Sequence, residues 1–198
     1  RERVLAQAQD IEGVIGGALL VWWEGTQYSS PSWALSTAAD EGTMSWGNFG
    51  MQQLSSEPRV AWPNDAAFTY RAMTQNAWYG SYGALSSVYD GLTGIAANPD
   101  AASDIDVNRA KAFAKLVQGI SHGYLASMYD SAFIFDETVN INTDVLAMKP
   151  YPNVYAAAIA ELQEAITLAT ASGVSFTLQD SWFDGNPMTN AQLARFAH

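Results

Sequence analysis

Three indole rings and several polar side chains occur together in residues 29–71, a segment without helical or strand periodicity. A sugar ring presents C–H faces that stack on indole, and its hydroxyls need carboxylate, amide or guanidinium partners nearby. We therefore expect a glycan-binding site formed by Asp40, Trp46, Asn48, Arg59 and Trp62. The alternative, which we favour for any single Trp, is that these rings only pin the segment to neighbouring helices.

Two pairs of adjacent carboxylates raise the question of glycoside hydrolysis: Asp40 with Glu41, and Asp136 with Glu137. That reaction needs two carboxyl groups roughly 5–10 Å apart, one on each side of the scissile bond. Side chains of adjacent residues diverge, so each pair could supply one catalytic group at most. We expect no catalytic residue, and keep a helical glycoside hydrolase as a third hypothesis.

The sequence contains no recognisable metal or cofactor signature. Asp104 opens a stretch that begins like a calcium loop, but Arg109 stands where that loop requires Gly and Lys115 where it requires Glu. Helix capping explains the acidic residues of this stretch better. His122 lies in a predicted buried helix, which favours a hydrogen-bonded core histidine over a metal ligand or a catalytic base. We therefore expect no metal site and no cofactor.

One long helix, residues 103–135, is the clearest predicted element. Ser103 and Asp106 have the spacing of a capping box, which satisfies backbone N–H groups of the first turn. Apolar residues then recur every three or four positions, from Phe113 to Met128, beside small residues that allow close helix approach. This pattern predicts a helix with packing partners on more than one side.

Further helices are predicted on both sides of the long one. Apolar periodicity indicates helices over residues 11–28, 74–97 and 154–169. Pro150 and Pro152 precede the last of these, and Gly173 supplies its left-handed stop. A final helix begins at Thr189 or Asn190. The glycines of the first helix, Gly13, Gly16 and Gly17, suggest close packing against a neighbour.

Two segments between these helices are loops. Residues 29–71 are interrupted by prolines but rich in aromatic residues, which makes disorder a poor explanation and function the better one. A second aromatic loop contains Phe176, Trp182 and Phe183, and for Trp182 and Phe183 packing is slightly favoured over ligand binding.

Composition narrows the classes of function. The 198 residues are 48% hydrophobic and 12% aromatic, as in a globular domain. Nine basic against 20 acidic side chains give a net charge of −11, which argues against nucleic acid as a partner. The longest apolar run, residues 14–23, is shorter than the roughly 18–20 residues of a membrane-spanning helix.

These elements predict an all-α fold of helix hairpins, an array similar to tetratricopeptide repeats that carries long aromatic-rich loops. Residues 1–198 would form a single domain, and because the last helix stops without a C-terminal cap, we expect an N-terminal fragment of a longer chain. The alternative is a short terminal helix that frays.

The sequence RAKAFAKLVQGISHGYLASMYD, residues 109–130, resembles the SusD/RagB family of nutrient-uptake lipoproteins. YPNVYAAAIAELQEAITLA and MTNAQLARF resemble the next two helices of that family, and ADEG at residues 39–42 resembles its acidic pair. The chain departs from the family after Asp130, where SAFIFDE replaces a Pro-containing exit, and at Asp90 and Gly91, where the family often has Asn.

The resemblance implies a helical-repeat scaffold without catalytic activity that captures an oligosaccharide or peptide at the cell surface. It also implies a TonB-dependent outer-membrane transporter as partner, and a lipid anchor on the outer membrane attached to a residue upstream of this chain. Our second hypothesis is a structural or assembly subunit, in which helix hairpins and exposed aromatic residues mediate protein contacts, including self-association.

Overall fold

The computed structural model describes residues 7–28, 32, 35–37, 39–42, 56–57, 65–68, 70–103 and 105–198. This part of the chain is mostly helical. Its long helices are α1 (Ala8–Thr26), α4 (Ala72–Ala97), α6 (Val107–Met128) and α7 (Tyr151–Thr170), and its short ones are α5 (Pro99–Ala102), η2 (Asp180–Phe183) and α8 (Asn190–Ala197). Strands β1 (Ser131–Ala132) and β2 (Lys149–Pro150) form a small antiparallel sheet, with Ser131 opposite Pro150. The prediction of a helical fold is confirmed, and the small sheet was not predicted.

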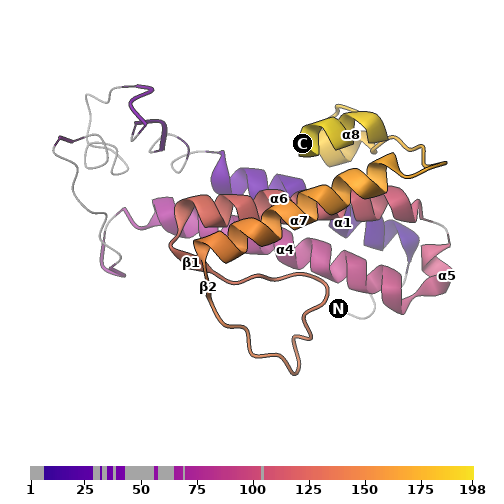
Figure 1. Ribbon diagram of the computed structural model, residues 1–198, viewed down its shortest axis with the longest axis horizontal. Coiled ribbons are helices and arrows are strands. Elements are labelled where there is room, and N and C mark those ends of the chain that lie inside the picture. Colours follow the sequence, from indigo (N-terminus) through magenta and orange to yellow (C-terminus); the bar gives the residue numbers. More distant parts are fainter. Residues whose placement is uncertain are drawn as a thin grey trace.

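The four long helices lie side by side, and each runs antiparallel to the next one along the chain (Figure 1). Glycines bring these helices close together. Gly25 of α1 lies against Gly80 of α4, where a β-carbon on Gly80 would come within 2.6 Å of the Gly25 α-carbon. Gly119 of α6 likewise accommodates the side chain of Leu162 of α7. Figure 1 also shows the segment between β1 and β2 projecting away from the bundle.

The prediction of one helix over residues 103–135 is wrong at both ends. Asp106 itself caps α6, because its carboxylate accepts the backbone N–H of Arg109 at 3.0 Å. Ser103 instead donates its hydroxyl to the carbonyl of Asp100, so the two residues form no capping box. At the other end Tyr129 is extended, with φ −129° and ψ 143°, and the chain enters β1. The apolar side chains that follow Met128 therefore do not continue the apolar stripe of α6.

The other predicted helices are confirmed, with boundaries shifted by a few residues. In α7 Pro152 occupies the first turn, where a missing N–H costs nothing. Gly173 has the predicted left-handed conformation, with φ 80°, but it does not itself end the helix, because α7 stops at Thr170 and its C-cap is Ala171. Thr189 caps α8 in a capping box with Gln192.

The close packing predicted for the α1 glycines holds for Gly16 alone. A β-carbon there would lie 2.2 Å from Nε1 of Trp182, whereas a β-carbon on Gly13 or Gly17 would meet nothing within 4 Å. Trp182 therefore fills the space that Gly16 leaves between α1 and η2.

The main core lies among α1, α4, α6, α7, η2 and α8, with Phe113 of α6 fully buried within it. A smaller cluster joins Leu85 of α4 and Leu125 of α6 to Ala132 of β1 and Val154 of α7. Among the described residues, no helix combines the length and the apolar character needed to cross a bilayer.

Candidate functional site

Four helix termini meet at one end of the bundle: the C-termini of α1 and α6 and the N-termini of α4 and α7. The Trp22 ring of α1 packs edge-on against Tyr124 of α6, with centroids 5.7 Å apart. The backbone N–H of Tyr151 donates to the carbonyl of Asp130 at 2.8 Å and joins the start of α7 to the end of α6. Because α1 ends and α4 begins here, both points at which residues 29–71 are connected to the bundle lie at this end.

Aromatic residues are abundant at this end, which we call the aromatic end. It comprises Trp22, Trp23, Tyr28, Trp78, Tyr79, Tyr82, Tyr124, Tyr129, Phe133, Tyr151 and Tyr155. These residues fall into two groups with different roles, a half-buried cluster and an exposed set.

The half-buried cluster consists of Trp78, Tyr82, Tyr129 and Phe133. The Trp78 ring lies 4.8 Å from Tyr82 and 5.0 Å from Tyr129, and both Trp78 and Tyr82 lie 6.2 Å from Phe133, measured between centroids. These rings bind α4, α6 and the segment after β1 into one unit. Edge-on aromatic pairs of this kind contribute about 0.5–1.5 kcal/mol beyond their buried area.

The phenol groups of this cluster are engaged in structural hydrogen bonds. The Tyr82 hydroxyl accepts the N–H of Phe133 at 2.7 Å and donates to its carbonyl at 2.9 Å, and the Tyr129 hydroxyl donates to the carbonyl of Thr74. Burial raises the pKa of Tyr82 to about 12, against a smaller lowering effect of its bond to Phe133. Burial also raises the pKa of Tyr129. Both phenols therefore stay neutral at physiological pH and serve as hydrogen-bonding struts.

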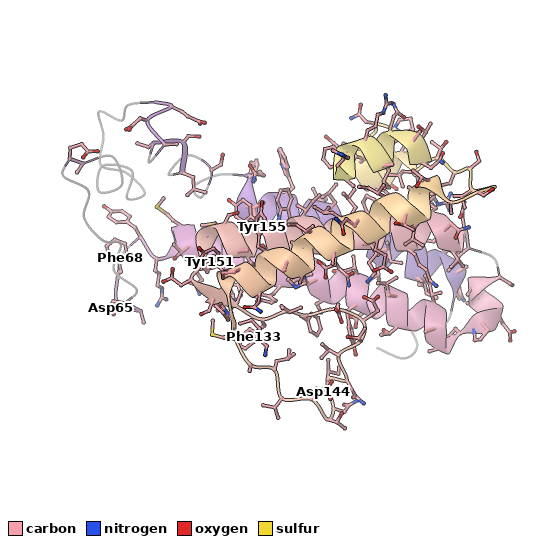
Figure 2. All side chains as sticks on the ribbon, in the orientation of Figure 1. Asp65, Phe68, Phe133, Asp144, Tyr151 and Tyr155 are labelled. Carbon is pink, nitrogen blue, oxygen red and sulfur yellow. The ribbon has the colours of Figure 1, made fainter. Side chains whose placement is uncertain are left out.

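The second group of rings is open to solvent. Trp23, Tyr28, Tyr79, Tyr151 and Tyr155 are 52%, 69%, 63%, 54% and 51% exposed, respectively. Tyr151 and Tyr155 lie one helical turn apart at the start of α7 (Figure 2). Exposed rings of this kind can stack on the C–H face of a sugar or on an apolar side chain of a protein partner.

Of the predicted glycan-binding residues, only Asp40 lies in the described part of the chain. It is exposed and sits in a turn, with a positive φ of 59° that Asp tolerates better than most residues. Trp46, Asn48, Arg59 and Trp62 lie outside the described residues. Their predicted grouping with Asp40 therefore stays a prediction.

The second aromatic loop packs onto the bundle. Trp182 is only 4% exposed, and its ring lies 5.1 Å from the Phe113 ring and 5.5 Å from the guanidinium carbon of Arg109. Arg109 also pairs with Glu12 of α1. A hollow of about 530 Å³ beside α1 and η2 is lined in part by Glu12, Gln179 and Trp182. Because the Trp182 ring is covered, it offers no open face for stacking, and the packing interpretation holds for it.

Asp136 and Glu137 diverge, as expected for adjacent side chains. The Asp136 carboxylate accepts the N–H and hydroxyl of Thr138 in a local turn. Glu137 turns towards α6, where Lys115 lies 2.6 Å from it and the amide of Gln118 donates to it at 2.8 Å. The two carboxylates therefore do not flank a common substrate position.

A buried polar network lies between α6, α7 and the segment after β1. Lys115 bridges Glu137 and Glu164 of α7, the latter at 3.1 Å. Burial lowers the pKa of Lys115, but its two carboxylate partners outweigh burial and raise it above its ordinary value. Burial raises the pKa of Glu137, but the bonds from Lys115 and Gln118 outweigh burial and lower it. Both partners of this pair are therefore charged at neutral pH.

His122 is a core histidine with both ring nitrogens used, as predicted. It is fully buried, its Nδ1 lies 2.8 Å from the carboxylate of Glu161, and its Nε2 accepts the N–H of Phe135 at 3.1 Å. This pattern assigns a neutral ring that carries its proton on Nδ1 and donates it to Glu161. Burial raises the pKa of Glu161, against smaller lowering effects of His122 and Lys115.

This polar network was not predicted, although the residue spacing in the sequence contains a signal for it. Lys115, Gln118 and His122 occur at helical spacing within an otherwise apolar helix, and Glu161 and Glu164 have the same spacing in the next helix. Polar residues at matching positions of two buried helix faces indicate a network across their interface. Within the described ranges, no three or more His, Cys, Asp or Glu side chains are grouped to hold a metal ion.

In the comparison with known proteins, no protein-family model, no curated protein and no solved structure matches the chain.

Proposed function

We propose that this chain is a non-catalytic binding module of the SusD type, which captures a nutrient glycan or peptide and delivers it to a TonB-dependent outer-membrane transporter. In this proposal it is held on the outer surface of the cell by a lipid on a residue upstream of Arg1. The proposal rests first on the resemblance of residues 109–130, 151–169 and 188–196 to that family.

The helix pairing is compatible with that resemblance. The segments that carry it form most of α6, α7 and α8, and α6 packs antiparallel on α7 in the manner of a helix hairpin. We assign these pairs to a tetratricopeptide-like array, in which Trp78 and Tyr82 of α4 are the aromatic pair of a first repeat helix.

The observation that carries the proposal is the position at which residues 29–71 join the bundle. The segment starts after α1 and ends before α4, so both its ends lie at the aromatic end. Three aromatic residues at this end, Trp23, Tyr79 and Tyr151, are 52%, 63% and 54% exposed. We infer that Asp40, Trp46 and Trp62 of this segment act together with such rings, because glycan recognition requires both stacking surfaces and polar groups.

Calorimetry against a panel of neutral and acidic oligosaccharides tests the proposal directly. Trp46→Ala and Trp62→Ala should each weaken binding of the responding glycan about tenfold or more, which corresponds to about 1.4 kcal/mol. Phe196→Ala is the matched control, because this ring is 53% exposed but lies on α8, away from the aromatic end. The absence of heat with any glycan or peptide would refute ligand capture.

A second function, assembly through protein contacts, has one observation in its favour. Tyr151, Tyr155 and Ile159 follow one another along α7 and are 54%, 51% and 43% exposed, which leaves an apolar stripe uncovered. If the chain is an assembly subunit, Tyr155→Ser and Ile159→Ser will abolish concentration-dependent oligomers in sedimentation velocity, and no ligand will bind. Monomers at all concentrations would rule out self-assembly.

A further inference from the structure

The segment of residues 133–139, which follows β1, is tied across the bundle by side-chain to backbone hydrogen bonds. We call it the strap. Its N-terminal part is fixed by the Tyr82 hydroxyl, which bonds both backbone groups of Phe133. Its far end is held by Tyr89, whose hydroxyl donates to the carbonyl of Val139 at 3.1 Å and whose ring stacks on Phe135 at 5.0 Å. Between these two points, the backbone of the strap is bound by His122.

The bond between His122 and the strap depends on a lone pair. Nε2 of the ring accepts the N–H of Phe135 at 3.1 Å, while Nδ1 faces the Glu161 carboxylate at 2.8 Å. A second proton on the ring can only be placed on Nε2, because Nδ1 already carries one. Protonated Nε2 is a donor, and two donors that face each other cannot form a hydrogen bond.

We propose that His122 is an acid-sensitive latch: when its ring takes up a second proton, Nε2 releases the Phe135 N–H and the middle of the strap loosens from α6. The proton comes from solvent and forms an N–H bond at Nε2, and no other covalent bond changes. The Glu161 carboxylate, still bound to Nδ1–H, stabilises the positive ring that forms.

Several charged groups surround the ring, but only a proton on His122 itself breaks the bond to Phe135. Glu161 and Glu164 face the site from α7, Lys115 from α6, and Asp136 and Glu137 from the strap. Lys115 and Glu137 stay charged and paired in mildly acidic solution, because the pKa of Lys115 is raised and that of Glu137 is lowered. A proton taken up by Glu161 leaves the Phe135 bond intact, because Nε2 keeps its lone pair.

The groups contributed by α4 are phenols, and they do not change charge at acidic pH. Tyr82 and Tyr89 therefore hold Phe133 and Val139 at pH 5 as they do at pH 7. The latch accordingly loosens the middle of the strap and not its ends. Phe135 is then free to leave Tyr89, and water gains access to the edge of the half-buried aromatic cluster that Phe133 completes.

Amide hydrogen exchange of the 198-residue chain between pH 7.5 and 5.0 tests the latch, with His122 titrated in parallel through its ring ¹⁵N shifts. Protection of the Phe135 amide, after correction for the intrinsic pH dependence of exchange, should fall about tenfold as His122 titrates. Protection of buried α6 amides such as Val117 should stay constant. The latch is refuted if His122 stays neutral to pH 4.5, if Phe135 keeps its protection while His122 titrates, or if Val117 loses protection in parallel.

Two variants separate the latch from general loosening of the strap. His122→Gln keeps an acceptor but cannot be protonated, so Phe135 protection should become independent of pH. Tyr89→Phe removes the bond to Val139 and should lower strap protection equally at every pH, with the His122 midpoint unchanged. If His122→Gln does not fold, the exchange profile of the natural chain still decides. A pH-dependent Phe135 in a folded His122→Gln variant would overturn the proposal.

Discussion

Gly25 and Gly80 bring the backbones of α1 and α4 into direct contact. A β-carbon on either glycine would lie 2.5–2.6 Å from the α-carbon of the other, a separation that real β-carbons do not adopt. The obstructing atoms belong to the backbone, so a side-chain rotation cannot relieve the overlap. This contact sets the distance between the two helices at the aromatic end.

Gly80→Ala should therefore destabilise the protein, by about 1–3 kcal/mol as for overpacked cores. Gly17→Ala is the matched control, because it lies in α1 with open space around it. It should stabilise the protein by about 0.5–1 kcal/mol through helix propensity. Urea unfolding followed by circular dichroism measures both, and equal effects of the two substitutions would contradict the backbone contact.

Tyr82→Phe should lower the free energy of unfolding by about 1–3 kcal/mol, since the hydroxyl that satisfies both backbone groups of Phe133 is lost. Tyr79→Phe removes a hydroxyl from a ring that is 63% exposed and should have no measurable effect. Thermal unfolding of both variants tests this, and a neutral Tyr82→Phe would show that water replaces the hydroxyl.

Glu161→Gln should stabilise the protein at pH 7. Burial raises the folded-state pKa of Glu161, so the folded state binds its proton more tightly than the unfolded state does. The ionised carboxylate therefore disfavours folding above the raised value, and this cost disappears as the pH falls below the ordinary value of 4.5. The difference in unfolding free energy between the variant and the natural chain should shrink from pH 7 to pH 4. A difference that is constant with pH would contradict this assignment.

Glu137→Gln should have the opposite effect. Its folded-state pKa is lowered by Lys115 and Gln118 against the raising effect of burial, so its charge stabilises the folded state above the ordinary value of 4.5. That contribution is lost as the pH falls through the lowered value. We expect the variant to be less stable by about 1.5–3 kcal/mol at pH 7, the range for hydrogen bonds to charged groups, with the loss shrinking in acid. Chemical denaturation at pH 7 and at pH 3 measures both values.

Helical periodicity in the sequence was sufficient to predict the long helices, since apolar spacing is a local property of each segment. The Thr189 cap and the proline start of α7 are local signals too, and both are confirmed. The end of α6 was mispredicted because Tyr129 and Phe133 continue its apolar character. Their rings are turned by contacts with Trp78, a residue about fifty positions away.

The proposed glycan-binding residues rest on residue type and family resemblance, and apart from Asp40 they lie outside the described residues. The polar network can be predicted from residue spacing only when two helices are compared. Lys115 and His122 of α6 pair with Glu164 and Glu161 of α7 across the interface. The sequence by itself determined the approximate positions of the long helices, the Thr189 cap, the proline start of α7 and the acidic, aromatic character of the chain. Only the tertiary structure decided which charges pair, that Trp182 is buried, and that residues 29–71 join the bundle at its aromatic end, because each of these depends on contacts between distant segments.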